Sequence, residues 1–211
     1  MTPDQYCRQK AAQSGSSFYY SFLFLPLEKR NAIIALYAFC REVDDAVDES
    51  REPVVAAAKL AWWRAEVAAL FAGTPQHPVT RALAGAVERF GISRAHLNEI
   101  MDGMEMDLNQ SRYPDFAALQ RYCHRVAGVV GVLAAAIFGY RNSMTLDYAD
   151  RLGLAFQLTN IIRDVGEDAR NDRIYLPMDE LERFEVAAAD ILGAHHTENF
   201  ARLMRFQTAG S

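Results

Sequence analysis

The sequence predicts an all-α protein formed by a single domain. Alanine is abundant and runs of β-branched residues are short, as is usual for helical chains. Apolar residues recur at i, i+3, i+4 and i+7 in several segments, and no segment shows the alternation expected of a strand. Prolines and glycines separate these segments, which predicts a series of helices joined by loops.

Length and composition limit the possible functions. A chain of 211 residues is expected to form one domain, residues 1–211. The contents of 51% hydrophobic and 23% charged residues are ordinary for a globular protein. The net charge of −5 argues against non-specific nucleic-acid binding, so an anionic substrate must be met by local arginines and metal. The three cysteines lack metal-ligand spacing and the N-terminus lacks a signal-peptide pattern, so we expect a cytoplasmic protein with reduced thiols.

Helix boundaries follow from capping residues, prolines and glycines. In chain order the predicted helices are 4–13, 18–25, about 26–49, 53–71, 78–90, one capped by Ser93, 114–138, one capped by Thr145, and 197–206. Pro53 and Pro78 suit a first helical turn, and Gly91 suits the position just after a helix. The hydroxyl-rich loop 14–17 is either a plain N-cap or a source of N–H and O–H donors for a phosphate.

The helix predicted over 114–138 contains an apolar run from Val126 to Phe138. This run is shorter than the roughly 20 residues that span a bilayer, which predicts a buried helix. Gly128 and Gly131 each cost about 1 kcal/mol of helix stability relative to alanine. Something is therefore expected to approach the backbone closely there, either another helix or an apolar ligand.

Residues 37–49 carry two stripes when they are placed on a helix. The apolar stripe consists of Leu36, Phe39, Cys40, Val43 and Val47, and the polar stripe of Tyr37, Arg41, Asp44 and Asp48. Asp44 and Asp48 lie one turn apart, about 6 Å along the axis, so their like charges repel. A divalent cation reverses this balance, because Mg²⁺ takes oxygen ligands that include one or two carboxylates. A solvated acidic helix end is the alternative.

Residues 153–168 repeat the same plan. The polar stripe consists of Gly153, Gln157, Asn160, Asp164 and Asp168, and the apolar stripe of Leu154, Leu158, Ile161 and Val165. The side-chain amides of Gln157 and Asn160 cost free energy on a core-facing helix unless they are paired. This cost favours a functional role for the polar stripe. Two such helices facing each other would form a carboxylate-lined cleft, with Arg41 and Arg163 available for anionic oxygens.

The two motifs resemble those of the squalene/phytoene synthases, which join two prenyl diphosphates head to head. Residues 15–19, 122–131 and 171–177 also resemble segments of that family, in the same order, so that the resemblance covers about 5–185. The sequences of residues 15–22 and 173–181 are most similar to those of bacterial presqualene diphosphate synthases. The resemblance implies an isoprenoid-synthase-type helical bundle around a central hydrophobic cleft. Family members usually continue further, so the bundle is expected to lack its C-terminal helices.

The resemblance also implies roles for individual residues. Two or three Mg²⁺ ions would be held by Asp44, Asp48, Asn160, Asp164 and Asp168. The expected catalytic residues are Arg41, Arg163, Tyr122 and Tyr175. The expected substrate-binding residues are Ser17, Phe18, Phe22, Tyr37, Arg41, Gly128, Gly131, Gln157 and Arg173, with the two glycines forming a smooth wall for an isoprenoid chain. Asp107 matches a family aspartate near the metal cluster, and a solvated helix face is its alternative.

The expected reaction condenses two farnesyl diphosphates to presqualene diphosphate, in hopanoid or squalene biosynthesis. Squalene, which requires NADPH, and phytoene, from geranylgeranyl diphosphate, are the alternatives. A ferritin-like di-metal protein is disfavoured because no Glu is followed three residues later by His. A head-to-tail prenyltransferase has motifs that read DDxxD, as residues 44–48 also do. It is disfavoured because the second motif reads DxxxD and is preceded by the polar line of Gln157 and Asn160. A non-catalytic helical binding protein stays open, as do the oligomeric state and peripheral contact with the inner membrane face.

Overall fold

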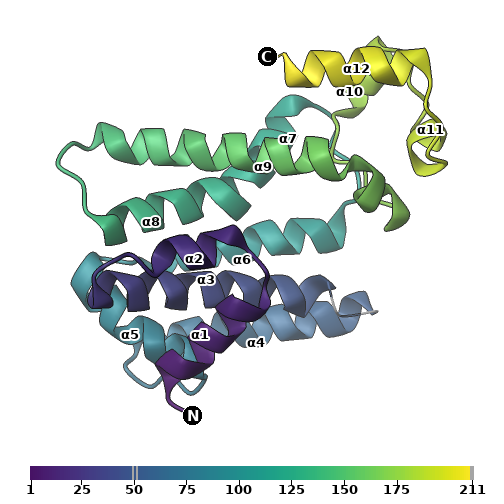
Figure 1. Ribbon diagram of the computed structural model, residues 1–211. Coiled ribbons are helices and arrows are strands. Elements are labelled where there is room, and N and C mark those ends of the chain that lie inside the picture. Colours follow the sequence, from purple (N-terminus) through teal and green to yellow (C-terminus); the bar gives the residue numbers. More distant parts are fainter. Residues whose placement is uncertain (49, 51, 210–211) are drawn as a thin grey trace.

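A computed structural model describes residues 1–48, 50 and 52–209 and confirms the all-α prediction (Figure 1). The helices are α1 (Pro3–Gln13), α2 (Ser17–Phe22), α3 (Leu27–Asp48), α4 (Pro53–Phe71), α5 (Pro78–Phe90), α6 (Arg94–Asn109), α7 (Phe116–Cys123), the π-helix η1 (His124–Gly128), α8 (Val129–Phe138), α9 (Met144–Arg170), α10 (Met178–Arg183), α11 (Ala188–Leu192) and α12 (Glu198–Thr208). Within these ranges no strand forms, and the β-type pairing is one isolated parallel bridge between Arg112 and Ile174.

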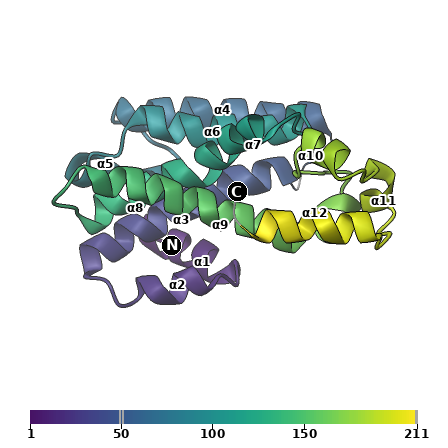
Figure 2. The ribbon, with the colours of Figure 1, turned by 90° about the horizontal axis from the view of Figure 1, so that it is seen from above.

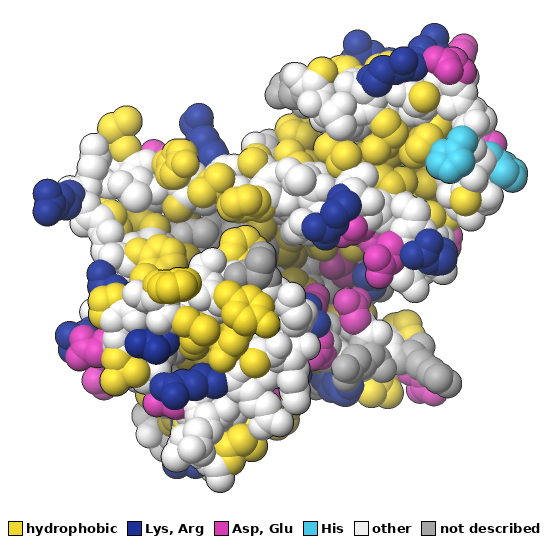
Figure 3. Space-filling view, in the orientation of Figure 1, with side chains coloured by type: hydrophobic (Ala, Val, Ile, Leu, Met, Phe, Trp, Pro, Cys, Tyr) yellow, Lys and Arg dark blue, Asp and Glu magenta, His cyan; other side chains and the backbone are white. Residues whose placement is uncertain are grey.

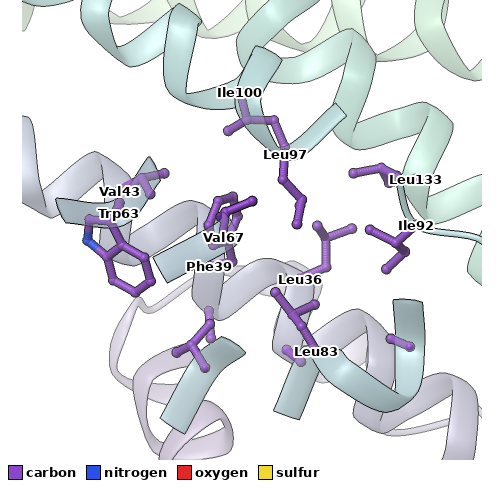
Figure 4. Packing of buried hydrophobic residues seen from close by; sticks show 14 of the residues in the cluster. Leu36, Phe39, Val43, Trp63, Val67, Leu83, Ile92, Leu97, Ile100 and Leu133 are labelled. Atoms are coloured by element: carbon purple, nitrogen blue, oxygen red, sulfur yellow. The ribbon is translucent and has the colours of Figure 1, made fainter. Parts of the chain in front are cut away.

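Helix α3 lies at the centre of the larger hydrophobic core. Figure 4 shows its residues Leu36, Phe39 and Val43 surrounded by apolar side chains of α4, α5, α6 and α8. The ring of Trp63 meets that of Phe39 edge-on, with 5.8 Å between centroids. The predicted apolar stripe is therefore confirmed in the core, except that Cys40 is only half-buried.

A second core joins α9 to the C-terminal helices. Its buried members include Tyr113, Tyr122, Ile161, Tyr175 and Leu203, so it connects α7, the middle of α9, the segment after α9 and α12. Figures 1 and 2 show α10, α11 and α12 gathered beyond the end of α9, at one end of the molecule. This arrangement fixes the C-terminal end of α9 relative to α7.

The helix predicted over 114–138 is interrupted. It begins at Phe116, where Asp115 accepts a hydrogen bond from the backbone N–H of Ala118 at 2.7 Å, and it widens into η1 before α8. The continuous stretch Phe116–Phe138 is long and apolar enough to cross a membrane, by length and composition alone. That is weak support for a membrane helix, because core helices pass the same test. Val129, Leu133 and Ile137 are buried in the larger core.

Glycines allow η1 and α8 to approach α9 closely. A Cβ atom on Gly131 would lie under 3.0 Å from the carbonyl oxygen of Ala149, and one on Gly128 would overlap the carboxylate of Asp150. A Cβ on Gly153 would in turn meet the carbonyl oxygen of Ala127. Of the two alternatives, another helix or an apolar ligand, the structure places another helix against Gly128 and Gly131. Their predicted contact with substrate stays a prediction.

Most predicted helix ends are confirmed. Pro53 and Pro78 begin α4 and α5, Gly91 ends α5 with φ 68°, and the Ser93 side chain accepts the N–H of His96 at 3.1 Å. The prediction that Thr145 caps the next helix is wrong. Helix α9 begins at Met144, and the preceding loop supplies the cap through Asn142, whose Oδ1 accepts the Met144 N–H at 2.9 Å.

Candidate active site

The two motif helices end at the same end of the bundle, on opposite sides of a hollow. Helix α9 continues through Gly166 to Arg170, so Asp164 and Asp168 stay one turn apart on the same face, as Asp44 and Asp48 do on α3. Figure 1 places the C-terminal ends of α3 and α9 at the same end of the bundle, and Figure 3 shows acidic and basic side chains lining a hollow there. The acidic ends of the two stripes therefore lie at the same end of the bundle.

Each predicted phosphate-binding arginine is paired with an aspartate of a motif. Arg41 contacts its own helix, with Nη1 2.6 Å from Asp44 and Nη2 2.9 Å from Asp45. Arg163 similarly contacts the neighbouring Asp164 at 2.6 Å. Arg173 bridges the two sides of the hollow, because it lies just after α9 and its Nη1 is 3.3 Å from Asp48 on α3. The guanidinium groups therefore offset part of the carboxylate repulsion.

The carboxylates of the two helices influence one another. Burial raises the pKa of Asp44 to about 6, against the opposing effect of Arg41, and the negative charge of Asp48 adds to the rise. Burial also raises the pKa of Asp168 to about 6, helped by Asp164 and, across the hollow, by Asp48. In contrast, hydrogen bonds from Arg163 lower the pKa of Asp164. A cation in the hollow would relieve repulsion coming from both helices.

The donor set fits Mg²⁺ bound together with a phosphorylated ligand. In the described ranges no group of three or more His, Cys, Asp or Glu side chains lies close enough to hold an ion alone. Mg²⁺ does not require such a cage, since it usually keeps waters and binds one or two carboxylates plus substrate phosphates. Paired aspartates on each side of the hollow, repelling one another and flanked by arginines, match that mode of binding.

Asp107 accepts hydrogen bonds from both predicted catalytic tyrosines. Its Oδ2 accepts the Tyr122 hydroxyl at 2.8 Å, and its Oδ1 accepts the Tyr175 hydroxyl at 2.9 Å. The two tyrosine rings stack at 5.3 Å, and Tyr113 packs against both of them. Burial raises the pKa of Asp107 to about 6, although these hydrogen bonds and Arg173 act in the opposite direction.

Several of the predicted substrate-binding residues lie on α2, α3 and α9. The rings of Phe18 and Phe156 meet edge-on at 6.0 Å, so α2 reaches across to α9. Tyr37 packs against Phe22 and donates its hydroxyl to Ser14 at 3.0 Å. Among the residues with described side chains, Gln157 and Asn160 find no hydrogen-bond partner although both are half-buried. Ser17 begins α2, but its side chain lies outside what the structure describes.

Two features of the site had no clear signal in the sequence. Lys10 of α1 contacts Glu42 at 3.2 Å and Asp45 at 2.7 Å, which ties the first helix to the acidic end of α3. Asp45 is thereby held by Lys10 and Arg41 together, away from the predicted metal-binding stripe. A lysine on a short amphipathic helix is an ordinary surface residue, so nothing in the sequence marked this contact.

We expect Asp44→Asn to stabilise the protein at neutral pH without metal. The folded-state pKa of about 6 lies above the ordinary value of 3.8, so the ionised carboxylate destabilises the fold increasingly as the pH rises from 4 through 6. In EDTA at pH 7.5, the Tm of the variant should exceed the wild-type value by about 2–4 °C. The difference should disappear near pH 4.

Asp164→Asn is the matched control, because the pKa of Asp164 is lowered and its ionised form is favoured in the folded state. It should bring no such gain in melting temperature. A Tm of Asp44→Asn below that of the wild type at pH 7.5 would contradict the burial argument.

Comparison with known proteins agrees with this geometry. The sequence profile of the family described as squalene/phytoene synthase matches residues 11–210. The phytoene synthase of Arthrospira platensis is 40% identical over 214 residues, covering 95% of this chain and 69% of that protein. The presqualene diphosphate synthase of Rhodopseudomonas palustris is 41% identical over 190 residues, covering 90% and 67%. The chain spans between about half and seven tenths of the length of its curated relatives.

Solved structures show the same architecture. The squalene synthase HpnC of Alicyclobacillus acidocaldarius superposes with a TM-score of 0.90 at 27% identity, covering 98% of this chain and 78% of that one. A dehydrosqualene synthase in complex with ligand gives a TM-score of 0.90 at 31% identity, covering 98% and 72%. The family profile spans nearly the whole chain, the relatives are prenyltransferases of one type, and the fold agrees, so this protein belongs to the squalene/phytoene synthase family.

Proposed function

We propose that this protein is a Mg²⁺-dependent prenyltransferase that condenses two farnesyl diphosphates head to head to presqualene diphosphate. One observation carries the proposal. The acidic ends of α3 and α9 lie close enough that Asp48 on α3 raises the pKa of Asp168 on α9, and Arg173, just after α9, contacts Asp48 at 3.3 Å. Such a site suits a polyanionic diphosphate that has to be neutralised before its C–O bond ionises.

Bound Mg²⁺ would supply most of the charge neutralisation for the departing diphosphate. Asp44 and Asp48 on one side, with Asn160, Asp164 and Asp168 on the other, would hold it. When diphosphate enters, Arg41, Arg163 and Arg173 can exchange their aspartate partners for phosphate oxygens, since a guanidinium binds either group through paired N–H donors. The arginines thus serve as temporary counterions in the empty site and as substrate ligands in the filled one.

Ionisation leaves an allylic cation that water would destroy, so the space beside the diphosphate must be dry. Phe18, Phe22 and Phe156 supply an aromatic wall between α2, α3 and α9. Tyr122 is the residue we assign to the final proton loss that closes the cyclopropane ring. It lies on α7, where its hydroxyl is fixed by Asp107.

Phytoene synthesis from geranylgeranyl diphosphate is the second candidate. It is favoured by the relatives, because several of them are phytoene synthases, including the 15-cis-phytoene synthase of a Synechocystis strain at 37% identity. The farnesyl substrate is favoured by the local sequence and by the presqualene diphosphate synthase at 41% identity. Squalene is a third product, formed only if NADPH reduces a second cation.

Product analysis tests these assignments. The protein is incubated with farnesyl or geranylgeranyl diphosphate and Mg²⁺, with and without NADPH, and the products are identified by mass. A cyclopropyl diphosphate of thirty carbons formed without NADPH supports the proposal, whereas phytoene from the longer substrate selects the second candidate. EDTA should stop either reaction. Metal-dependent binding without turnover would favour the non-catalytic helical binding protein instead.

The partners and location follow from this chemistry. The substrates are prenyl diphosphates, and we propose cytoplasmic activity, with peripheral contact to the inner membrane face for delivery of an apolar product. The exposed rings of Phe24 and Tyr140 suit such contact. Vesicle co-sedimentation checks the contact, and recovery of all the protein in the supernatant would argue against it.

A further inference from the structure

Tyr122, Tyr175 and Asp107 form a hydrogen-bonded network in which both tyrosines are buried. Asp107 contributes one carboxylate oxygen to each phenol, at 2.8 Å to Tyr122 and 2.9 Å to Tyr175. Both hydroxyl protons are therefore directed at the same carboxylate. The two phenols also interact with each other, and a phenol oxygen that donates its proton still has lone pairs with which it can accept another.

We propose that Asp107 is a positioning residue that receives the proton lost in ring closure, through Tyr122. This inference rests on the proposed function. A neutral phenol can take a proton from a carbocation only if it releases its own hydroxyl proton in the same step. Asp107 lies at hydrogen-bond distance along the direction in which that proton would leave.

The step balances in atoms and charge. The C–H bond beside the cationic centre breaks, and its electron pair closes the cyclopropane ring. The proton moves to the Tyr122 oxygen, while the phenol's own proton moves to Oδ2 of Asp107. The tyrosine stays neutral, the carboxylate becomes a carboxylic acid, and solvent removes that proton after product release.

The surroundings of Asp107 support a proton acceptor there. The titratable and charged groups that interact with it are Tyr122, Tyr175, Arg173, Asp48, Asp44, Tyr113 and Cys123. Burial favours the protonated carboxyl, and it also raises the pKa of Tyr122, so an isolated tyrosinate is disfavoured as the base. Burial therefore favours the state in which Asp107 is protonated and Tyr122 is neutral over a state in which Tyr122 is a tyrosinate.

The test is the partition of products in Asp107→Asn. The amide keeps the shape of the side chain but cannot accept the proton. Because ionisation precedes proton loss, diphosphate release from farnesyl or geranylgeranyl diphosphate should continue, while water captures the cation. We expect kcat for the cyclopropyl product to fall by about 10²–10³-fold with KM within about threefold. The main product should become a hydroxylated diphosphate of the joined carbon skeleton, formed when water captures the cation left after carbon–carbon bond formation. The melting temperature should not fall, and Asp107→Glu should restore part of the cyclopropyl product.

Asp102→Asn is the matched control, because Asp102 lies on the same helix but pairs with Arg64, away from the hollow. It should leave the product partition unchanged. Two outcomes would overturn the inference: a wild-type product partition in Asp107→Asn, or an equal loss of diphosphate release and cyclopropyl product, which would indicate a role through the metal site or the fold. A wild-type protein that releases no diphosphate from either substrate refutes the proposed function itself, and the proton route with it.

Discussion

Asp48→Ala should lower kcat by about 10³-fold or more without unfolding the protein. Asp48 connects the two sides of the hollow, since it pairs with Arg173 and raises the pKa of both Asp44 and Asp168. Removing it deletes a predicted metal ligand and frees Arg173, but it also relieves repulsion among the remaining carboxylates. We therefore expect lost turnover with a Tm within about 3 °C of the wild type. Steady-state kinetics at several Mg²⁺ concentrations and thermal melting measure the two effects.

Asp164→Ala should behave in the same way on the opposite side of the hollow, although it also removes the ion pair with Arg163. Asp102→Ala provides the control for loss of an aspartate that pairs outside the hollow, and its turnover should stay near wild type. Turnover close to wild type in both Asp48→Ala and Asp164→Ala would contradict the prediction that these aspartates bind Mg²⁺. A collapse of Tm would show that these aspartates serve the fold.

Gly153→Ala should destabilise the protein by about 3 kcal/mol, and Gly131→Ala by a similar amount. In both cases the added methyl group meets a backbone carbonyl oxygen of the facing helix, that of Ala127 or Ala149. Backbone atoms cannot move aside as a flexible side chain can, so η1 and α8 must shift away from α9. Chemical denaturation at constant m-value measures the loss.

Gly85→Ala is the matched control, because Gly85 lies inside α5 and a Cβ there meets nothing within 4 Å. It should gain up to about 1 kcal/mol from helix propensity alone. If Gly153→Ala and Gly131→Ala also proved neutral or stabilising, α8 and α9 would not be packed as closely as the structure shows. Loss of substrate binding with full stability in Gly131→Ala would instead support the predicted contact with the isoprenoid chain.

The interruption at η1 illustrates where sequence patterns stop being informative. The sequence predicts one helix over 114–138, and the chain is indeed helical from Phe116 to Phe138. A π-turn is a change of one residue in hydrogen-bond register, and here it coincides with the segment where Gly128 approaches Asp150. The close approach involves a residue of the facing helix, so the sequence of 116–138 alone could not reveal it.

The sequence by itself determined the helices and the direction in which each polar stripe faces. Helical period and capping act between residues a few positions apart. The polar stripes from Tyr37 to Asp48 and from Gln157 to Asp168 could therefore be predicted from the sequence. Only the tertiary structure decided which polar stripes lie near each other. The pairing of Arg173 with Asp48 and the convergence of two tyrosines on Asp107 join residues far apart in the chain. Such contacts depend on how helices pack, which periodicity around a single axis cannot specify.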